Sequence, residues 1–280
     1  MIGRRGATRN ARVTRYREDG VDRRRDVLAV EEPLEIRLAW TDGAARRTES
    51  LAVTMRTPGN DFELTAGFLH GEGVLSRASD LLELTYCTGP EEQKYNVVEA
   101  RLSPGRAVDW ERLRRNFYTS SSCGVCGKAS LEAVQAQGCA LLPEGPFVRE
   151  ELVASLPDRL LEGQDVFART GGLHAAGVFD GEGGRRTVME DVGRHNAVDK
   201  VVGHALLGRW LPANDHVLVV SGRASFELVQ KSIAAGIPIL VAVGAPSSLA
   251  VELAGRFRQT LVGFARDGGF NVYATPERIR

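Results

Sequence analysis

Two cysteines, Cys123 and Cys126, lie in a run of mostly small residues, Ser120-Ser-Ser-Cys-Gly-Val-Cys-Gly-Lys-Ala-Ser130. Residues 131–137, which follow, have helical periodicity, so we expect the pair just before or within the first turn of a helix. There the helix dipole and the free N–H groups favour a thiolate, and Lys128 adds positive charge. The pair is therefore expected to be nucleophilic near neutral pH.

The spacing of this pair leaves several chemistries open. A zinc site would need two further ligands, and the chain contains no second Cys-x-x-Cys. A thioredoxin-like redox pair is possible, although neither tryptophan nor proline accompanies the motif. A cysteine that carries sulfur as a persulfide would also fit the spacing, as would a loop without chemistry. The remaining cysteines, Cys87 and Cys139, stand alone and are expected to be buried and inert.

A zinc-dependent deaminase is the alternative that the residues nearly match. Such enzymes combine His-x-Glu with Pro-Cys-x-x-Cys, and here His70 and Glu72 precede the cysteine pair. However, Ser122 occupies the proline position. His70 and Glu72 also fall at the end of a predicted helix, whereas the deaminase chemistry needs them where a helix opens. We therefore expect a glycine-capped helix end here, and no bound zinc.

Composition indicates a globular protein with a sizeable core. The 280 residues are 43% hydrophobic and 26% charged, with a net charge of zero. This balance does not favour a nucleic-acid partner. No apolar run approaches the roughly 20 residues of a membrane span, and no hydrophobic stretch follows Arg4-Arg5 as an export signal requires. We expect a cytoplasmic protein with reduced cysteines and no membrane partner.

Residues 1–30 are arginine-rich and without periodicity, and they are predicted to be a disordered tail. Residues 31–140 are predicted to form a β-rich part that carries a helix and the Cys-x-x-Cys loop. Its expected elements are a hairpin of strands 34–40 and 51–55, a helix over 61–70, and strands near 81–86 and 95–102.

Residues 141–280 are predicted to form an α/β part with a layered mixed sheet. Three apolar strands near 216–221, 237–243 and 260–264 alternate with helices near 225–235 and 247–257. This alternation implies parallel β-α-β units joined by right-handed crossovers. Before them, the pattern predicts a helix over 149–161, a hairpin of strands 174–179 and 186–190, and a helix that ends at 207.

Two loops should meet at the carboxyl edge of the parallel strands, where open α/β sheets bind ligands. They are 221–225, with Ser221, Gly222, Arg223 and Ser225, and 244–248, with Ser247. Each leads into a helix N-terminus with free N–H groups, which suits a phosphate. The alternative is that Ser225 and Ser247 are ordinary helix caps.

Two histidines and two acids could line the same cleft. They are His174, His195, Asp191 and Asp199. In the alternative interpretation Asp191 caps a helix, while His195 and Asp199 form a surface pair at positions i and i+4.

Six segments along the chain form a distinctive set. They are Arg56-Thr-Pro-Gly-Asn-Asp61, Ser120–Ser130, Thr170-Gly-Gly-Leu-His-Ala-Ala176, Asp191-Val-Gly-Arg-His-Asn-Ala-Val-Asp-Lys200, Val220-Ser-Gly-Arg-Ala-Ser-Phe-Glu-Leu-Val-Gln-Lys231 and Ala245-Pro-Ser-Ser-Leu-Ala-Val-Glu252. Together these segments resemble the FdhD/NarQ family of formate dehydrogenase accessory sulfurtransferases. The similarity runs from about Glu32 to Tyr273. One departure is Asn60, where a histidine is expected.

The resemblance implies a sulfurtransferase. Cys123 would take sulfur from a cysteine desulfurase as a persulfide, with Cys126 as its neighbour for relay or resolution. The sulfur would go to the bis-molybdopterin guanine dinucleotide form of the molybdenum cofactor, which formate dehydrogenase needs to be active. A non-catalytic chaperone for the same cofactor is the alternative, and it would not need either cysteine.

The resemblance also implies a fold related to the cytidine deaminases and assembly as a homodimer. The family's cofactor-binding segment corresponds here to Phe270, Asn271, Val272, Tyr273, Ala274 and Thr275.

Overall fold

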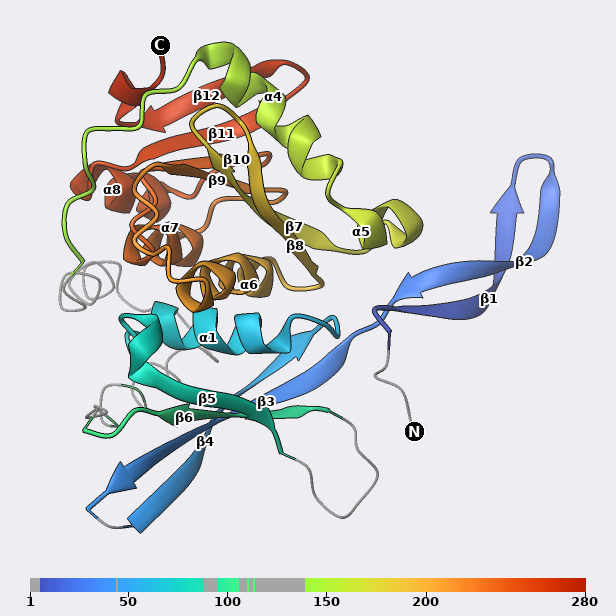
Figure 1. Ribbon diagram of the computed structural model, residues 1–280. Helices are drawn as coiled ribbons and strands as arrows, with labels where there is room; N and C mark the ends of the chain where they lie inside the picture. The colour runs from blue at the N-terminus through green and yellow to red at the C-terminus, as the bar shows by residue number, and fades with distance from the viewer. Residues whose placement is uncertain (1–5, 44, 88–94, 106–109, 111–112, 114–138) are drawn as a thin grey trace.

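The computed structural model describes residues 6–43, 45–87, 95–105, 110, 113 and 139–280 (Figure 1). Cys123, Cys126 and the helix predicted over 131–137 lie outside the described residues. No helix in the described part of the chain is long and apolar enough to cross a bilayer.

The strands are β1 Thr8–Arg17, β2 Gly20–Ala29, β3 Glu32–Asp42, β4 Ala45–Arg56, β5 Leu81–Tyr86, β6 Val97–Leu102, β7 His174–Asp180, β8 Arg185–Asp191, β9 His216–Val220, β10 Ile239–Ala242, β11 Thr260–Arg266 and β12 Gly269–Ala274. The helices are α1 Asp61–Gly71, α4 Glu150–Leu161, α5 Asp165–Thr170, α6 Arg194–Leu207, α7 Phe226–Ala234 and α8 Ser248–Arg256, with short 3-10 turns at Ala78–Asp80 and Pro276–Arg278.

A long hairpin replaces most of the tail predicted for residues 1–30. Strands β1 and β2 pair antiparallel from Thr8↔Ala29 to Arg17↔Gly20, and the hairpin projects away from the rest of the molecule (Figure 1). Its tip is the two-residue loop Glu18-Asp19, and Gly20, the first residue of β2, has a φ of 139°, which favours glycine. The many arginines conceal the alternation of the strands, because charged side chains occupy both faces.

The N-terminal sheet has the strand order β4-β3-β6-β5 and is mixed, since β3 pairs antiparallel with β4 and parallel with β6. Leu34, Ile36 and Leu38 of β3 are fully buried, and they belong to two clusters that also contain residues of α1. Alternation of apolar residues predicted the β3–β4 hairpin correctly, and helical periodicity predicted α1 correctly.

The C-terminal sheet has the strand order β12-β11-β10-β9-β7-β8, and β9, β10 and β11 are parallel as predicted. Helices α6, α7 and α8 pack on one face of the sheet and α4 on the other (Figure 1). Alternate residues of the parallel strands enter the two cores, as Leu218 and Val219 do. The chain is therefore an α/β protein with two mixed sheets. The closer relation to cytidine deaminases stays a prediction.

Helix α1 from the N-terminal part crosses helix α6 from the C-terminal part at two glycines. A Cβ on Gly67 would lie 1.8 Å from the carbonyl oxygen of Asp199, and a Cβ on Gly203 would lie 1.8 Å from that of Glu63. The backbones of the two helices are therefore in direct contact, which requires a hydrogen atom in place of each side chain. This crossing sets how the two sheets lie relative to each other.

A buried ion pair of the C-terminal part binds the backbone of Thr57 from the N-terminal part. Lys200 Nζ lies 2.7 Å from Asp191 Oδ2, and both side chains are almost completely buried. Thr57 takes part through its N–H, which donates to Asp191, and its carbonyl, which accepts from Lys200. The charges thus tie the loop between β4 and α1 to the start of α6.

Candidate functional site

Topology brings several chain segments to the carboxyl edge of the parallel strands. Strand β7 runs antiparallel to β9, so it begins at this edge with His174, and β8 ends there because His174 pairs with Asp191. Helix α6 begins at the same place with Arg194. The two predicted loops follow β9 and β10. Four separate turns of the chain therefore contribute to one surface.

The two predicted loops lie side by side and are joined by backbone hydrogen bonds. The N–H of Gly244 donates to the carbonyl of Gly222 at 3.0 Å, and the N–H of Ser247 donates to that of Ala224 at 3.0 Å. A Cβ on Gly244 would lie 3.0 Å from the backbone nitrogen of Arg223, so this close approach needs glycine. The Arg223 side chain is exposed.

The three serines of these loops have different roles. Ser247 Oγ accepts a hydrogen bond from the N–H of Ala250 at 3.3 Å, so it is the ordinary cap of α8. Ser225 makes no such bond to α7, and its hydroxyl lies 3.2 Å from His195 Nε2. Ser221 Oγ accepts from the N–H of Ala175 at 2.8 Å and anchors β7 to β9. Ser225 is thus the hydroxyl that faces other side chains of the edge.

A basic cluster of His174 and Arg194 lies next to Gly222. The sequence points to His174 as a candidate for this edge but not to Arg194. A Cβ on Gly222 would lie 3.5 Å from His174 Nδ1 and 3.8 Å from Arg194 Cδ, so both side chains border this loop. The buried Nε of Arg194 has no hydrogen-bond partner among the described residues. Partial burial, then the charges of Arg194 and His195, lower the pKa of His174. The cluster is suited to an anion.

His195 pairs with a different acid from the one considered in the sequence. Its Nε2 lies 2.8 Å from Glu227 Oε2, and this hydrogen bond lowers the pKa of Glu227. Asp199 instead lies 2.7 Å from Lys231 Nζ and is buried. The suggested surface pair of His195 and Asp199 is wrong, because Asp199 faces the interior. Glu227 could have been found from its position just after the 221–225 loop, and Arg194 from its position just after β8, which ends at this edge.

The proposed cofactor-binding segment 270–275 forms strand β12 and its end. Asn271 and Tyr273 are exposed, and a Cβ on Gly263 would lie 3.0 Å from Tyr273 Cε2 and 2.8 Å from Pro246 Cδ. Tyr273 therefore lies beside the 244–248 loop.

The other members of the segment lie away from this edge. Phe270 and Val272 pack against the core under α4. Because β12 runs antiparallel to β11, Ala274 pairs with Leu261 near the start of β11. The carbonyl of Thr275 accepts from Thr260 Oγ1 at that opposite end. The structure thus brings Asn271 and Tyr273 towards the two edge loops. It leaves Ala274 and Thr275 at the opposite end of β11, away from these loops.

His70 and Glu72, the candidates for a deaminase-like site, are at the end of α1 as predicted. His70 is largely enclosed, and its Nδ1 and Nε2 lie 2.9 and 3.1 Å from the carbonyl oxygens of Leu75 and Ala234. Both ring nitrogens are thus occupied by backbone contacts, which is typical of a structural histidine. Burial is the main reason that the pKa of His70 is lowered.

Cys87 and Cys139 are both half-buried, and neither forms a disulfide with another described residue. Burial, and then the charge of Glu99, raise the pKa of the Cys87 thiol. A raised pKa leaves little thiolate near neutral pH, so Cys87 is poorly suited to attack a sulfur donor. This agrees with the expectation of an inert thiol at Cys87, whereas the expectation that both cysteines are buried is wrong, because each is half-exposed.

Comparison with known proteins gives consistent matches over nearly the whole chain. The sequence model of the FdhD/NarQ family matches residues 29–280. The sulfur carrier protein FdhD of Streptomyces avermitilis is 53% identical over 277 residues, which cover 97% of this chain and 95% of the relative. The protein of the same name from Mycobacterium tuberculosis is 49% identical, with 98% and 99% coverage. A solved structure described as a formate dehydrogenase accessory protein from Desulfotalea psychrophila has a TM-score of 0.75 at 27% identity, covering 98% of this chain and 100% of that one.

Proposed function

The chain belongs to the FdhD/NarQ family, and from this premise we propose that it is a sulfurtransferase acting for formate dehydrogenase. It takes sulfur from a cysteine desulfurase on Cys123 and delivers it to the bis-molybdopterin guanine dinucleotide cofactor, which is its substrate. The observation that carries this proposal is the name sulfur carrier protein, borne by relatives about half identical along the whole chain. The deaminase alternative has no support from these relatives.

Sulfur capture is a thiol exchange in this proposal. The Cys123 thiolate attacks the outer sulfur of the desulfurase persulfide. A new S–S bond forms on Cys123, the S–S bond of the donor breaks, and the desulfurase thiolate leaves. The number of electrons on sulfur does not change in this step, so no oxidant is needed.

Sulfur release requires two electrons if the product is a sulfide ligand of molybdenum. Attack of the Cys126 thiolate on Cys123 Sγ supplies them, because it forms a Cys123–Cys126 disulfide and expels hydrosulfide. A cellular thiol reductant then restores both thiols. We propose this resolving role for Cys126, and we place the reaction in the cytoplasm in a homodimer.

The mass of the loaded protein tests the proposal. After incubation of the Cys126→Ala variant with a cysteine desulfurase and cysteine, we expect the tryptic peptide that carries Cys123 to gain the mass of one sulfur atom. Reduction with dithiothreitol should remove it. Peptides that carry Cys87 and Cys139 serve as internal controls and should stay unmodified. Loading of those thiols alone, or no loading at all, would refute sulfur capture at Cys123.

The carboxyl edge is where we propose that the cofactor's guanine and phosphates bind. The exposed guanidinium of Arg223, the side chains of Arg194 and His174, and the N-termini of α7 and α8 are suited to phosphate. The exposed ring of Tyr273 could stack on a base. Asn271, on the same strand, could hydrogen-bond the edge of that base.

Replacing Arg223 by alanine is expected to weaken GDP binding about thirtyfold, because a charge-assisted contact contributes roughly 2 kcal/mol. Titration calorimetry of the purified protein with GDP and ADP measures this. Arg256→Ala is the matched control, since Arg256 is also exposed but lies in the last turn of α8, away from the edge. Equal affinity for GDP and ADP, or equal effects of the two substitutions, would place the guanine site elsewhere.

A further inference from the structure

The hairpin of β1 and β2 has one face on which arginines are not balanced by acids. Residues directly opposite each other in an antiparallel pair share a face. The pairs Arg12↔Arg25, Thr14↔Arg23 and Tyr16↔Val21 therefore lie together. All six side chains are exposed. We call these six residues the arginine face.

The other face of the same hairpin carries two acids, Asp22 and Asp26, beside its arginines. Arg15 stands opposite Asp22, and Arg24 forms an ion pair with Asp26 at 3.9 Å. The difference matters because like charges directly opposite each other destabilise a β-ladder, whereas opposite charges stabilise it. The pairing of Arg12 with Arg25 thus disfavours the free hairpin, and an anionic group bound between them would relieve the repulsion.

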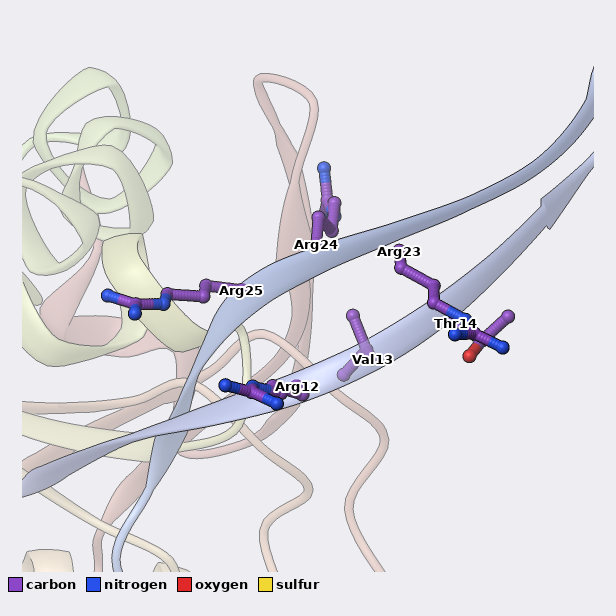
Figure 2. A pocket seen from close by; sticks show the side chains of 6 residues that line it. All are labelled: Arg12, Val13, Thr14, Arg23, Arg24 and Arg25. Carbon is purple, nitrogen blue, oxygen red and sulfur yellow. The ribbon is translucent and has the colours of Figure 1, made fainter.

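The strands around these arginines form a hollow. A cavity of about 470 Å³ is lined by Arg12, Val13, Thr14, Arg23, Arg24 and Arg25. Figure 2 shows Arg12 and Arg25 reaching from the two strands towards the same side of the ribbon, while Arg24 points to another. The hollow therefore presents the guanidinium groups of Arg12 and Arg25 to the same side.

Apolar side chains extend the arginine face towards the tip. Tyr16 is 77% exposed, and Val21 opposite it is 60% exposed. Among the described residues, the hairpin lies near the rest of the molecule at its base. There Arg169 donates to Thr8 at 3.3 Å, and β2 lies against α5. An isolated two-stranded hairpin is marginally stable in water. Tyrosine and arginine are the residue types that dominate protein–protein interfaces, so the tip is suited to a protein partner.

We propose that the arginine face docks onto an acidic surface of the formate dehydrogenase that the protein serves, with Tyr16 and Val21 against an apolar patch beside the carboxylates. The choice of this partner rests on the proposed function. A protein is favoured over a nucleic acid because the chain as a whole has no net charge and because the exposed apolar pair continues the arginine face. Guanidinium groups bind carboxylates through paired, charge-assisted hydrogen bonds.

The test is the affinity of the full-length protein for the purified catalytic subunit of formate dehydrogenase, measured by interferometry. We expect Arg12→Gln/Arg23→Gln/Arg25→Gln to weaken binding roughly tenfold or more and to reduce its salt dependence. The melting temperature should not fall, because the substitutions remove the repulsion between Arg12 and Arg25. A loss of binding in this variant therefore does not arise from unfolding.

The matched control is Arg9→Gln/Arg15→Gln/Arg17→Gln, which removes the same charge from the other face of the same hairpin without touching the residues that line the hollow. It should change the affinity by less than roughly threefold. Equal weakening by both variants, or no binding by the unaltered protein, would overturn the proposal. Tighter binding of a random DNA duplex than of formate dehydrogenase would also overturn it. Sulfur loading of Cys123 should be normal in both variants, so failure of loading would count against the proposed function and not against docking.

Discussion

Formate dehydrogenase activity is expected to disappear in cells whose only copy of this protein carries Cys123→Ala. Alanine has no sulfur nucleophile, so no persulfide can form at this position. The protein itself should still fold, and it should still bind GDP, since the proposed nucleotide site lies at the sheet edge. Formate-dependent dye reduction in extracts measures activity, and calorimetry measures binding.

Two further variants separate sulfur transfer from cofactor chaperoning. Cys87→Ala is the control, because Cys87 is half-buried with a raised pKa and should not carry sulfur. It should support normal activity. Cys126→Ala should retain sulfur on Cys123 but lose most activity if Cys126 resolves the persulfide. Normal activity with Cys123→Ala would favour the cofactor chaperone instead.

The largest effect on stability is expected from Gly203→Ala at the crossing of α1 and α6. The added Cβ would lie 1.8 Å from the carbonyl oxygen of Glu63 and 2.7 Å from the backbone nitrogen of Gly67. Neither atom can move without displacing a helix. Overpacking against a rigid neighbour typically costs 1–3 kcal/mol, and we expect about 3 kcal/mol or more here. The melting temperature should fall by on the order of 10 °C in a thermal unfolding experiment.

Gly255→Ala is the matched control for this prediction. Gly255 also lies in a helix, but a Cβ there has no atom within 4 Å. Alanine favours a helix over glycine by roughly 0.5–1 kcal/mol, so this variant should be as stable as the unaltered protein or slightly more so. A melting temperature for Gly203→Ala that equals that of Gly255→Ala would mean that the helices can separate at the crossing without loss.

Much of the fold follows from local pattern. The alternation of Leu34, Ile36 and Leu38 predicted β3, because a strand buries every second residue. The apolar strands β9, β10 and β11 between helices predicted their parallel order, since right-handed crossovers permit few other arrangements. The adjacency of the 221–225 and 244–248 loops followed from that order. The family followed from motifs along the chain.

The partners of individual charges depended on tertiary structure. His195 pairs with Glu227 rather than Asp199, because the turn of α6 places Asp199 against Lys231 in the interior. The direction of β12, which separates Thr275 from the site, follows from its antiparallel pairing with β11. Such pairings join residues distant in the sequence, and local periodicity contains no information about them.

The sequence by itself determined the thiol pair, the family and the α/β class, because these depend on residue types, their order and short-range spacing. The tertiary structure alone decided the glycine contact between α1 and α6, the basic cluster at His174 and Arg194, and the arginine face of the hairpin. In the hairpin, charged residues occupy both faces, so composition suggested a disordered tail. The register of β1 against β2 shows which arginines stand together, because pairing across strands decides which charges meet.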